Sequence, residues 1–271
     1  MMRDIAVATM GRTPAVATQF IKYLRDSRGL KFNEFILIST SEPFVYGGSK
    51  LVKYVLEDIY DDLYIEVLKT DVSDLTSLDD VEKYVNNVLK RLREYVFGSR
   101  DLSTIHFCIA GGRKNMAILS TIFSLIMRPT ILYHIINLKV DIQDQPYKDF
   151  EDMIISLGSS TDRNSDRLIY NEIRRFRDRK DRSILDILFP PISDYRVVEI
   201  YVPPYPRHYI DILRHIVSSE DGVKLEDLKS YSSRIDEYIS PLANSNLIEF
   251  TRDGSIKPSK YLIKIREFFM D

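Results

Sequence analysis

The chain has 271 residues, 44% of them hydrophobic and 29% charged, and its formal net charge is −2. This composition supports a sizeable core and excludes an intrinsically disordered chain, and the balanced charge excludes a protein that binds nucleic acid over its whole surface. Cys108 is the only cysteine, so internal disulfides are excluded and a reducing, cytoplasmic location is expected. No apolar run approaches the length of a membrane span, and no signal peptide is expected.

Short apolar runs alternate with segments of helical periodicity through the first half of the chain. The runs predict strands at 5–9, 35–40, 64–68, 104–109 and 130–136. Helices are expected after Pro14, around 50–62, over 81–92 and over 117–126. Such alternation with short connections predicts an α/β fold, in which a Rossmann-like parallel sheet is covered by helices on both faces.

The most informative motif lies between the strand at 104–109 and the helix that follows it. Gly111 and Gly112 come first, then the cations Arg113 and Lys114, and the helix opens with Asn115 and Met116. Backbone amides and the helix dipole attract anions at such a junction, and the two cations add full positive charge. The motif therefore predicts a phosphate-binding loop. Its spacing matches neither the Walker loop nor the dinucleotide fingerprint.

A second loop, Gly11-Arg12-Thr13-Pro14, follows the first strand. Thr13 before Pro14 is a good helix N-cap, and it could equally offer backbone and hydroxyl contacts to a phosphate or ribose. Ser41 follows the second strand. Since ligands bind at the carboxyl ends of parallel strands, these three loops are expected to line one pocket.

Other chemistries have little support in the sequence. The four histidines are scattered without the spacing of metal ligands, so we expect no metal and no cofactor. His106 and His134 fall inside predicted strands, where a core position is expected. Arg128 and His134 have the Arg-x5-His spacing of HEPN ribonucleases, but that motif belongs to helices of an all-helical domain.

A charged insertion around 141–195 interrupts the pattern before a further strand at 195–202. Eight cations and four acids lie between Arg163 and Arg182. They fit a solvated, salt-bridged helix, or a positive face that closes over a polyanionic ligand. Arg167, Arg174 and Lys180 are candidates for contacting such a ligand. A proline-rich linker at 203–206 then divides the chain into domains at 1–202 and 207–271.

The second domain has the pattern of a winged helix-turn-helix. Three helices are expected around 209–217, 224–228 and 233–242, and strands at 247–250 and 261–265 flank Asp253-Gly254. Ten cations and eleven acids nearly balance in this domain, whereas DNA-binding domains have a basic face. A role in dimerisation or support is therefore favoured over binding of duplex DNA.

The Gly-x-Thr-Pro loop after strand one and Gly-Gly-Arg-Lys-Asn after strand four resemble the loops of CARF domains, the CRISPR-associated sensors of cyclic oligoadenylates. With a C-terminal winged helix, the chain resembles the CRISPR ring nuclease 1 family and the CARF-winged-helix transcription regulators. The resemblance implies a homodimer that binds cyclic tetra-adenylate across its two-fold axis. No ribonuclease domain follows the CARF-like half, which favours a ring nuclease that ends type III CRISPR signalling.

The family reaction is metal-independent cleavage of cyclic tetra-adenylate to linear di-adenylate with a 2′,3′-cyclic phosphate. The resemblance implies that Lys114, then Arg113, stabilise charge at phosphorus and that Thr13 fixes the ribose or phosphate. Gly11, Arg12, Gly111, Gly112, Asn115, Met116 and Ser41 would complete the ligand site. The alternatives are a transcription regulator without nuclease activity and a non-catalytic dimer that sequesters the messenger. The sequence leaves ring size and turnover rate open.

Overall fold

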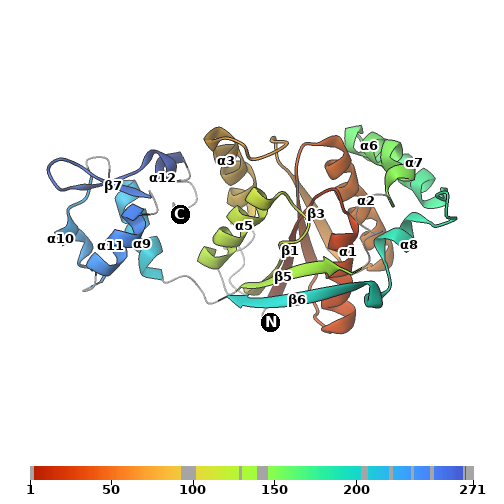
Figure 1. The fold of residues 1–271 in the computed structure, drawn as a ribbon, viewed down its shortest axis with the longest axis horizontal. Helices are drawn as coiled ribbons and strands as arrows, with labels where there is room; N and C mark the ends of the chain where they lie inside the picture. Colours follow the sequence, from red (N-terminus) through yellow and green to blue (C-terminus); the bar gives the residue numbers. More distant parts are fainter. Residues whose placement is uncertain are drawn as a thin grey trace.

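A computed structural model describes residues 3–92, 102–127, 130–138, 146–202, 207–219, 222–232, 235–244, 247–264 and 266. Figure 1 shows an α/β body that contains the main sheet, and a smaller module formed by the C-terminal residues beside it. The expected linker at 203–206, Arg128 and the expected helix start at Ser233 lie outside the described residues. No helix of the described part of the chain is long and apolar enough to cross a membrane.

Six strands form the main sheet, in the spatial order β3-β2-β1-β4-β5-β6. They are β1 (Arg3–Thr9), β2 (Glu34–Ser39), β3 (Tyr64–Lys69), β4 (Leu102–Cys108), β5 (Thr130–Asn137) and β6 (Tyr195–Val202). The first five run parallel, which confirms the predicted Rossmann-like sheet, whereas β6 pairs antiparallel with β5. The order reverses between β1 and β4, and a crevice opens at the carboxyl ends of two strands at such a switch point.

Helices cover both faces of this sheet because alternate strand residues point to opposite sides. On one face, α1 (Ala15–Lys22), the π-turn η1 (Tyr23–Ser27) and α2 (Pro43–Ile59) cover Ala6, Ala8 and Leu37. On the other, α3 (Leu78–Tyr84), η2 (Val85–Leu89) and α5 (Lys114–Met127) lie over Val7 and Phe107. The helix expected around 50–62 begins seven residues earlier, since Pro43 starts it and the Glu42 side chain accepts a hydrogen bond from the amide of Phe44.

The charged insertion forms a helical layer on the outer side of α2. It comprises η4 (Lys148–Phe150), α6 (Glu151–Ser159), α7 (Arg163–Arg175), α8 (Ile184–Leu188) and η5 (Ile192–Asp194). A Cβ on Gly47 of α2 would lie 1.8 Å from the carbonyl oxygen of Ile154, and one on Gly158 would lie 1.9 Å from that of Pro43. The two helices therefore cross with their backbones in contact, a distance that glycine alone permits.

A buried ion pair strengthens this crossing. Lys50 Nζ lies 2.9 Å from Asp166 Oδ1 and also donates to the carbonyl oxygens of Leu157 and Ser160. The insertion is thus a packed part of the α/β body rather than a loose flap.

The C-terminal module contains α9 (Arg207–Ser218), α10 (Leu225–Leu228), α11 (Ile235–Asn244), the hairpin β7 (Ile248–Phe250) and β8 (Ile256–Pro258), and α12 (Lys260–Lys264). Gly254 has a φ of 81° in the hairpin turn, as its sequence predicted. The strand expected at 261–265 is wrong. Strand β8 begins directly after the turn, and Ser259 then starts a helix by accepting a hydrogen bond from the amide of Leu262.

Candidate functional site

The two predicted glycine loops lie against each other at the switch point between β1 and β4. A Cβ on Gly11 would lie 1.8 Å from the carbonyl oxygen of Gly111, and one on Gly111 would lie 2.3 Å from that of Thr9. A Cβ on Gly112 would meet the side chain of Thr9 at 2.5 Å. All three glycines have ordinary negative φ values, so close packing of backbone, rather than turn geometry, requires them.

The hydroxyl of Thr13 does not cap α1, contrary to the sequence prediction. The carbonyl oxygen of Thr13 accepts a hydrogen bond from the amide of Val16 at 3.1 Å, while the amide of Ala15 donates to the hydroxyl of Tyr147 at 3.0 Å. Tyr147 comes from the insertion and is buried, with burial raising the pKa of its hydroxyl. Because Tyr147 caps the helix, the Thr13 hydroxyl has no partner among the described residues and is available to a ligand.

A cavity of about 430 Å³ opens beside the two loops. Its described lining comprises Thr13, Val16, Ala110, Gly111 and residues 134–137 at the end of β5. The sequence predicted Thr13 and Gly111 as ligand-binding residues, but it gave no indication that the end of β5 also lines the cavity. His134 is exposed and lines this cavity, so its expected core position is wrong, whereas His106 is buried as expected and its Nδ1 lies 2.8 Å from the Tyr133 hydroxyl.

The predicted cations lie at the start of α5, where its first turn has free amides. The side chains of both Arg113 and Lys114 are exposed. The guanidinium of Arg113 lies 3.3 Å from Asp74, which follows β3, while Lys114 has no ion-pair or hydrogen-bond partner within the described part of the chain. At the amino end of α5, Lys114 thus offers a positive charge that no described residue compensates. The charge of Arg113 would be shared between an incoming anion and the carboxylate of Asp74.

The other predicted residues take different places. Arg12 is paired with Glu42, the N-cap of α2, at 3.6 Å and with Glu151 of α6 at 3.0 Å, so its side chain links the first loop to the starts of both helices. Asn115 donates to the carbonyl oxygen of Leu75, which anchors the second loop to the segment after β3.

The side chains of Met116 and Ser41 do not line the cavity. Met116 packs fully buried in the core beneath α5, which removes its side chain from ligand contact. Ser41 is half-buried and its amide donates to the carbonyl oxygen of Val72 at 3.2 Å. The loop after β2 is thus held toward β3, away from the switch point.

Arg167 and Arg174, which the sequence offered as ligand contacts, lie far from this cavity. Both pair with Asp58 near the carboxyl end of α2, at 3.6 and 2.8 Å. Glu42, next to the glycine loops, precedes the opposite end of that helix, which is about 20 Å away at 1.5 Å per residue. The salt-bridged interpretation of α7 is therefore confirmed for these two residues.

The groups that this site offers to a ligand are a hydroxyl, backbone amides and cationic side chains. Burial raises the pKa of the Cys108 thiol to about 12, so this thiol at the end of β4 is no nucleophile at neutral pH. Among the described residues no group of three or more histidine, cysteine or acidic side chains is placed to hold a metal ion. The arrangement can bind a phosphodiester through backbone amides and Lys114 and orient it through Thr13.

Comparison with known proteins identifies one family. The family model described as CRISPR-associated protein NE0113 matches residues 13–170, which include Thr13 and the whole second loop and end before the C-terminal module. A search of curated proteins found no match.

Solved structures show only distant likeness. Enterococcus italicus Csm6 bound to cyclic hexa-2'-fluoro-hexa-dAMP is 12% identical with a TM-score of 0.42, over 91% of this chain and 57% of that one. The type III effector protein XopQ complexed with adenosine diphosphate ribose is 14% identical with a TM-score of 0.32, over 65% of this chain and 54% of that one. The chain thus spans little more than half the length of either protein.

Proposed function

The chain belongs to the family of CRISPR-associated protein NE0113, and on that premise we propose that it is a CARF-type ring nuclease. It binds cyclic tetra-adenylate and cleaves it without a metal ion to linear di-adenylate that ends in a 2′,3′-cyclic phosphate. The observation that carries this proposal is the cavity at the switch point, where the free Thr13 hydroxyl and the backbone of Gly111 line the same space.

The proposed reaction needs no nucleophile from the protein. The ribose 2′-oxygen attacks the adjacent phosphorus and loses its proton, the bond from phosphorus to the 5′-oxygen breaks, and that oxygen takes up a proton. The protein must hold the attacking and leaving oxygens in line and stabilise the added charge at phosphorus. Lys114 suits the second task because its charge is exposed and uncompensated by any described residue, and Thr13 suits the first.

His134 is a further candidate within the same cavity. Among the described residues that line it, His134 has the only imidazole side chain. An imidazole in this position can accept the 2′-hydroxyl proton or donate one to the leaving oxygen, either directly or through water. The sequence contained no signal for this role, because the residue falls in the middle of an apolar strand.

A homodimer is proposed on the apolar surface beside the cavity. Five aliphatic side chains are exposed on α5 and on the same side of β5 and β6, namely Ile118, Ile122, Ile136, Val198 and Ile200. Val198 and Ile200 lie directly across from His134 and Leu132, and α5 packs beside β5 (Figure 1). A second copy on this face would bring two cavities together, and one cavity of about 430 Å³ accommodates only part of a tetra-adenylate ring.

The deciding experiment incubates the purified chain with radiolabelled cyclic tetra-adenylate in EDTA and separates the products by chromatography. Conversion to di-adenylate with a 2′,3′-cyclic phosphate is the expected result. Tight binding without conversion over a long incubation would instead identify a sequestering protein or a regulator. Binding of duplex DNA in a salt-dependent gel shift would support the regulator, although α11 opens with the exposed acids Asp236 and Glu237.

A further inference from the structure

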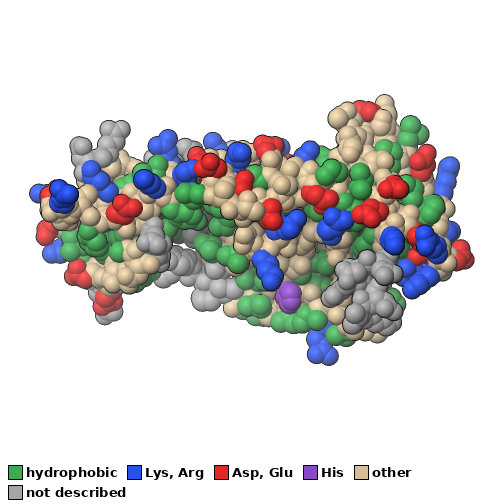
Figure 2. Space-filling view, turned by 45° about the horizontal axis from the view of Figure 1, so that its top comes forward, with side chains coloured by type: hydrophobic (Ala, Val, Ile, Leu, Met, Phe, Trp, Pro, Cys, Tyr) green, Lys and Arg blue, Asp and Glu red, His purple; other side chains and the backbone are tan. Residues whose placement is uncertain are grey.

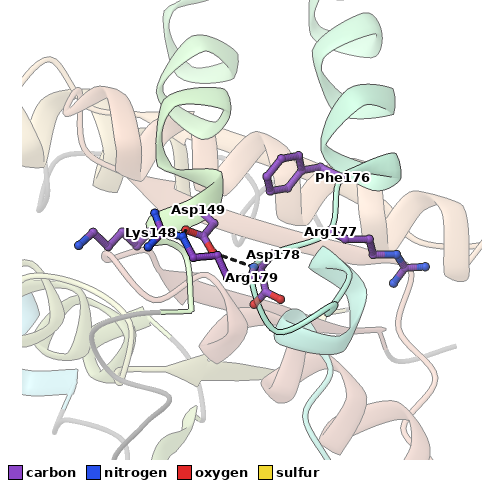
Figure 3. A pocket seen from close by; sticks show the side chains of 6 residues that line it. All are labelled: Lys148, Asp149, Phe176, Arg177, Asp178 and Arg179. Atoms are coloured by element: carbon purple, nitrogen blue, oxygen red, sulfur yellow. Dashed lines mark hydrogen bonds and ion pairs between the residues drawn. The ribbon is translucent and has the colours of Figure 1, made fainter.

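A second cavity, of about 440 Å³, lies in the helical insertion and shares no described residue with the first. It opens between the start of α6 and the segment that follows α7 (Figure 3). Six described residues line it, and they are Lys148, Asp149, Phe176, Arg177, Asp178 and Arg179. An aromatic ring, three cations and two acids thus surround one crevice.

The two acids are already engaged within the protein. Asp149 accepts hydrogen bonds from the backbone amide of Arg179 at 3.0 Å and pairs with its guanidinium at 3.2 Å. Asp178 accepts from the amides of Lys180 and Arg182 at 2.9 and 2.8 Å. Burial opposes ionisation of Asp178, but these amides and the Arg182 guanidinium outweigh it and hold the pKa below its usual value. The acids therefore shape the walls and leave little free negative charge.

The cations, in contrast, face solvent. The side chain of Arg179 is 84% exposed and that of Arg177 is 55% exposed, with Asp186 at 3.6 Å as the only ionic neighbour of Arg177 within the described residues. Lys148 has no ion pair among the described residues. The segment from Arg174 to Arg182 contains six cations and two acids, although the net charge of the whole chain is −2. Figure 2 shows blue side chains gathered at the end of the molecule that carries α7 and α8.

The ring of Phe176 is both exposed and held in place. It is 39% exposed, and it packs against the buried ring of Phe150 with centroids 5.2 Å apart and planes at 79°. A fixed aromatic ring among cations is the combination on which single-stranded nucleic acids bind, because bases stack on the ring while phosphates pair with the cations.

We propose that this crevice, defined by Lys148, Phe176, Arg177 and Arg179, binds a single strand of nucleic acid with one base stacked on Phe176. Lys148 and Arg177 extend to opposite sides of the crevice (Figure 3), so their charges suit successive phosphates of an extended strand better than one compact mononucleotide. A duplex keeps its bases stacked on one another and cannot present one to the ring. The site is independent of cyclic tetra-adenylate cleavage.

The test measures fluorescence anisotropy of a labelled oligouridylate of about ten nucleotides, a length within the range that single-strand sites cover. Uridylate is chosen so that the probe does not imitate an adenylate ligand of the glycine loops. Saturable binding at low salt is expected, with a weaker response to uridine monophosphate and to a duplex. An oligothymidylate arm distinguishes RNA from DNA as the source of the strand.

Substitutions test where the single-stranded nucleic acid binds. Phe176→Leu keeps an apolar side chain against Phe150 but removes the stacking surface, and about fivefold or more weaker binding is expected from the loss of one stacked base. The double variant Lys148→Ala with Arg177→Ala should lower the slope of log affinity against log salt by about 1.4, because two phosphate contacts are lost. Arg175→Ala is the matched control, since it removes another exposed charge that does not line the crevice.

Three results would overturn the proposal. One is the absence of binding by the unaltered protein at low salt. Another is binding that Phe176→Leu and the double variant leave unchanged while circular dichroism shows both folded. The last is loss of oligouridylate binding in Lys114→Ala, which would place the strand at the glycine loops instead.

Discussion

Asp74 holds the guanidinium of Arg113 at 3.3 Å, so one of the two cations at the start of α5 is partly neutralised in the ligand-free protein. Asp74 also accepts the amide of Leu75 at 2.8 Å, and Asn115 donates to the carbonyl oxygen of Leu75. The segment after β3 is thereby linked at two points to the start of α5. A phosphate that enters the site must compete with this carboxylate.

Replacing Asp74 should therefore tighten anion binding. Asp74→Asn keeps an oxygen for the amide of Leu75 but removes the charge, and we expect the affinity for cyclic tetra-adenylate to rise by up to about fivefold, the scale of one exposed ion pair. Isothermal titration calorimetry measures this affinity. Asp71→Asn, a change on the same segment away from Arg113, should leave the affinity unchanged, and an equal gain in that control would refute the explanation.

Removal of the charge at position 114 should slow catalysis more than it weakens binding. Lys114→Ala is expected to lower kcat by about 10² to 10³, the range found when a single group that stabilises developing charge is removed. Single-turnover cleavage of labelled cyclic tetra-adenylate in EDTA gives the rate. Lys31→Ala, at an exposed position before β2, is the matched control, and equal rates in both variants would exclude Lys114 from the reaction.

The hydroxyl of Thr13 and the imidazole of His134 can be tested separately. Thr13→Val keeps the branched shape and should lose cleavage, whereas Thr13→Ser, which keeps the hydroxyl, should retain most of it. His134→Gln should flatten the dependence of kcat on pH if the imidazole transfers a proton. An unchanged pH profile would assign His134 a purely packing role.

The contact between the glycine loops should be intolerant of any side chain. In Gly11→Ala the added Cβ would lie 1.8 Å from the carbonyl oxygen of Gly111, so the loops must separate, and we expect a loss of about 1–3 kcal/mol in the free energy of unfolding. Urea denaturation measures it. Gly29→Asn is the control because position 29 has open space and a φ of 64°, which asparagine tolerates.

Buried His106 should make stability depend on pH below neutrality. Burial lowers the pKa of His106 from its usual 6.5, and nearby Asp4 only partly offsets this effect. Above pH 6.5 the imidazole is neutral in both folded and unfolded chains. As the pH falls below 6.5 the unfolded chain binds the proton first, so stability declines toward the lower folded-state pKa. Urea midpoints between pH 7.5 and 5 should fall more steeply for the unaltered protein than for His106→Gln; parallel curves would contradict this assignment.

The sequence predicted the local features of the fold. Alternation of apolar runs and helical periodicity indicated the parallel sheet. The two loops were visible because backbone crowding restricts positions 11, 111 and 112 to glycine. Strand β8 and the start of α2 were misplaced by several residues. Such boundaries depend on caps such as Ser259 and Glu42, which compete with the periodic signal.

Only the tertiary structure decided how the site residues are used. The Thr13 hydroxyl has no partner among the described residues, because Tyr147, 132 residues from Ala15 along the chain, caps α1 in its place. His134 is exposed on β5, and a strand period alone cannot distinguish a covered face from an open one. The sequence by itself determined which residues are candidates for binding phosphate. Long-range packing determined which of them are already paired within the protein and which remain for a ligand, because a partner's identity is not encoded in local spacing.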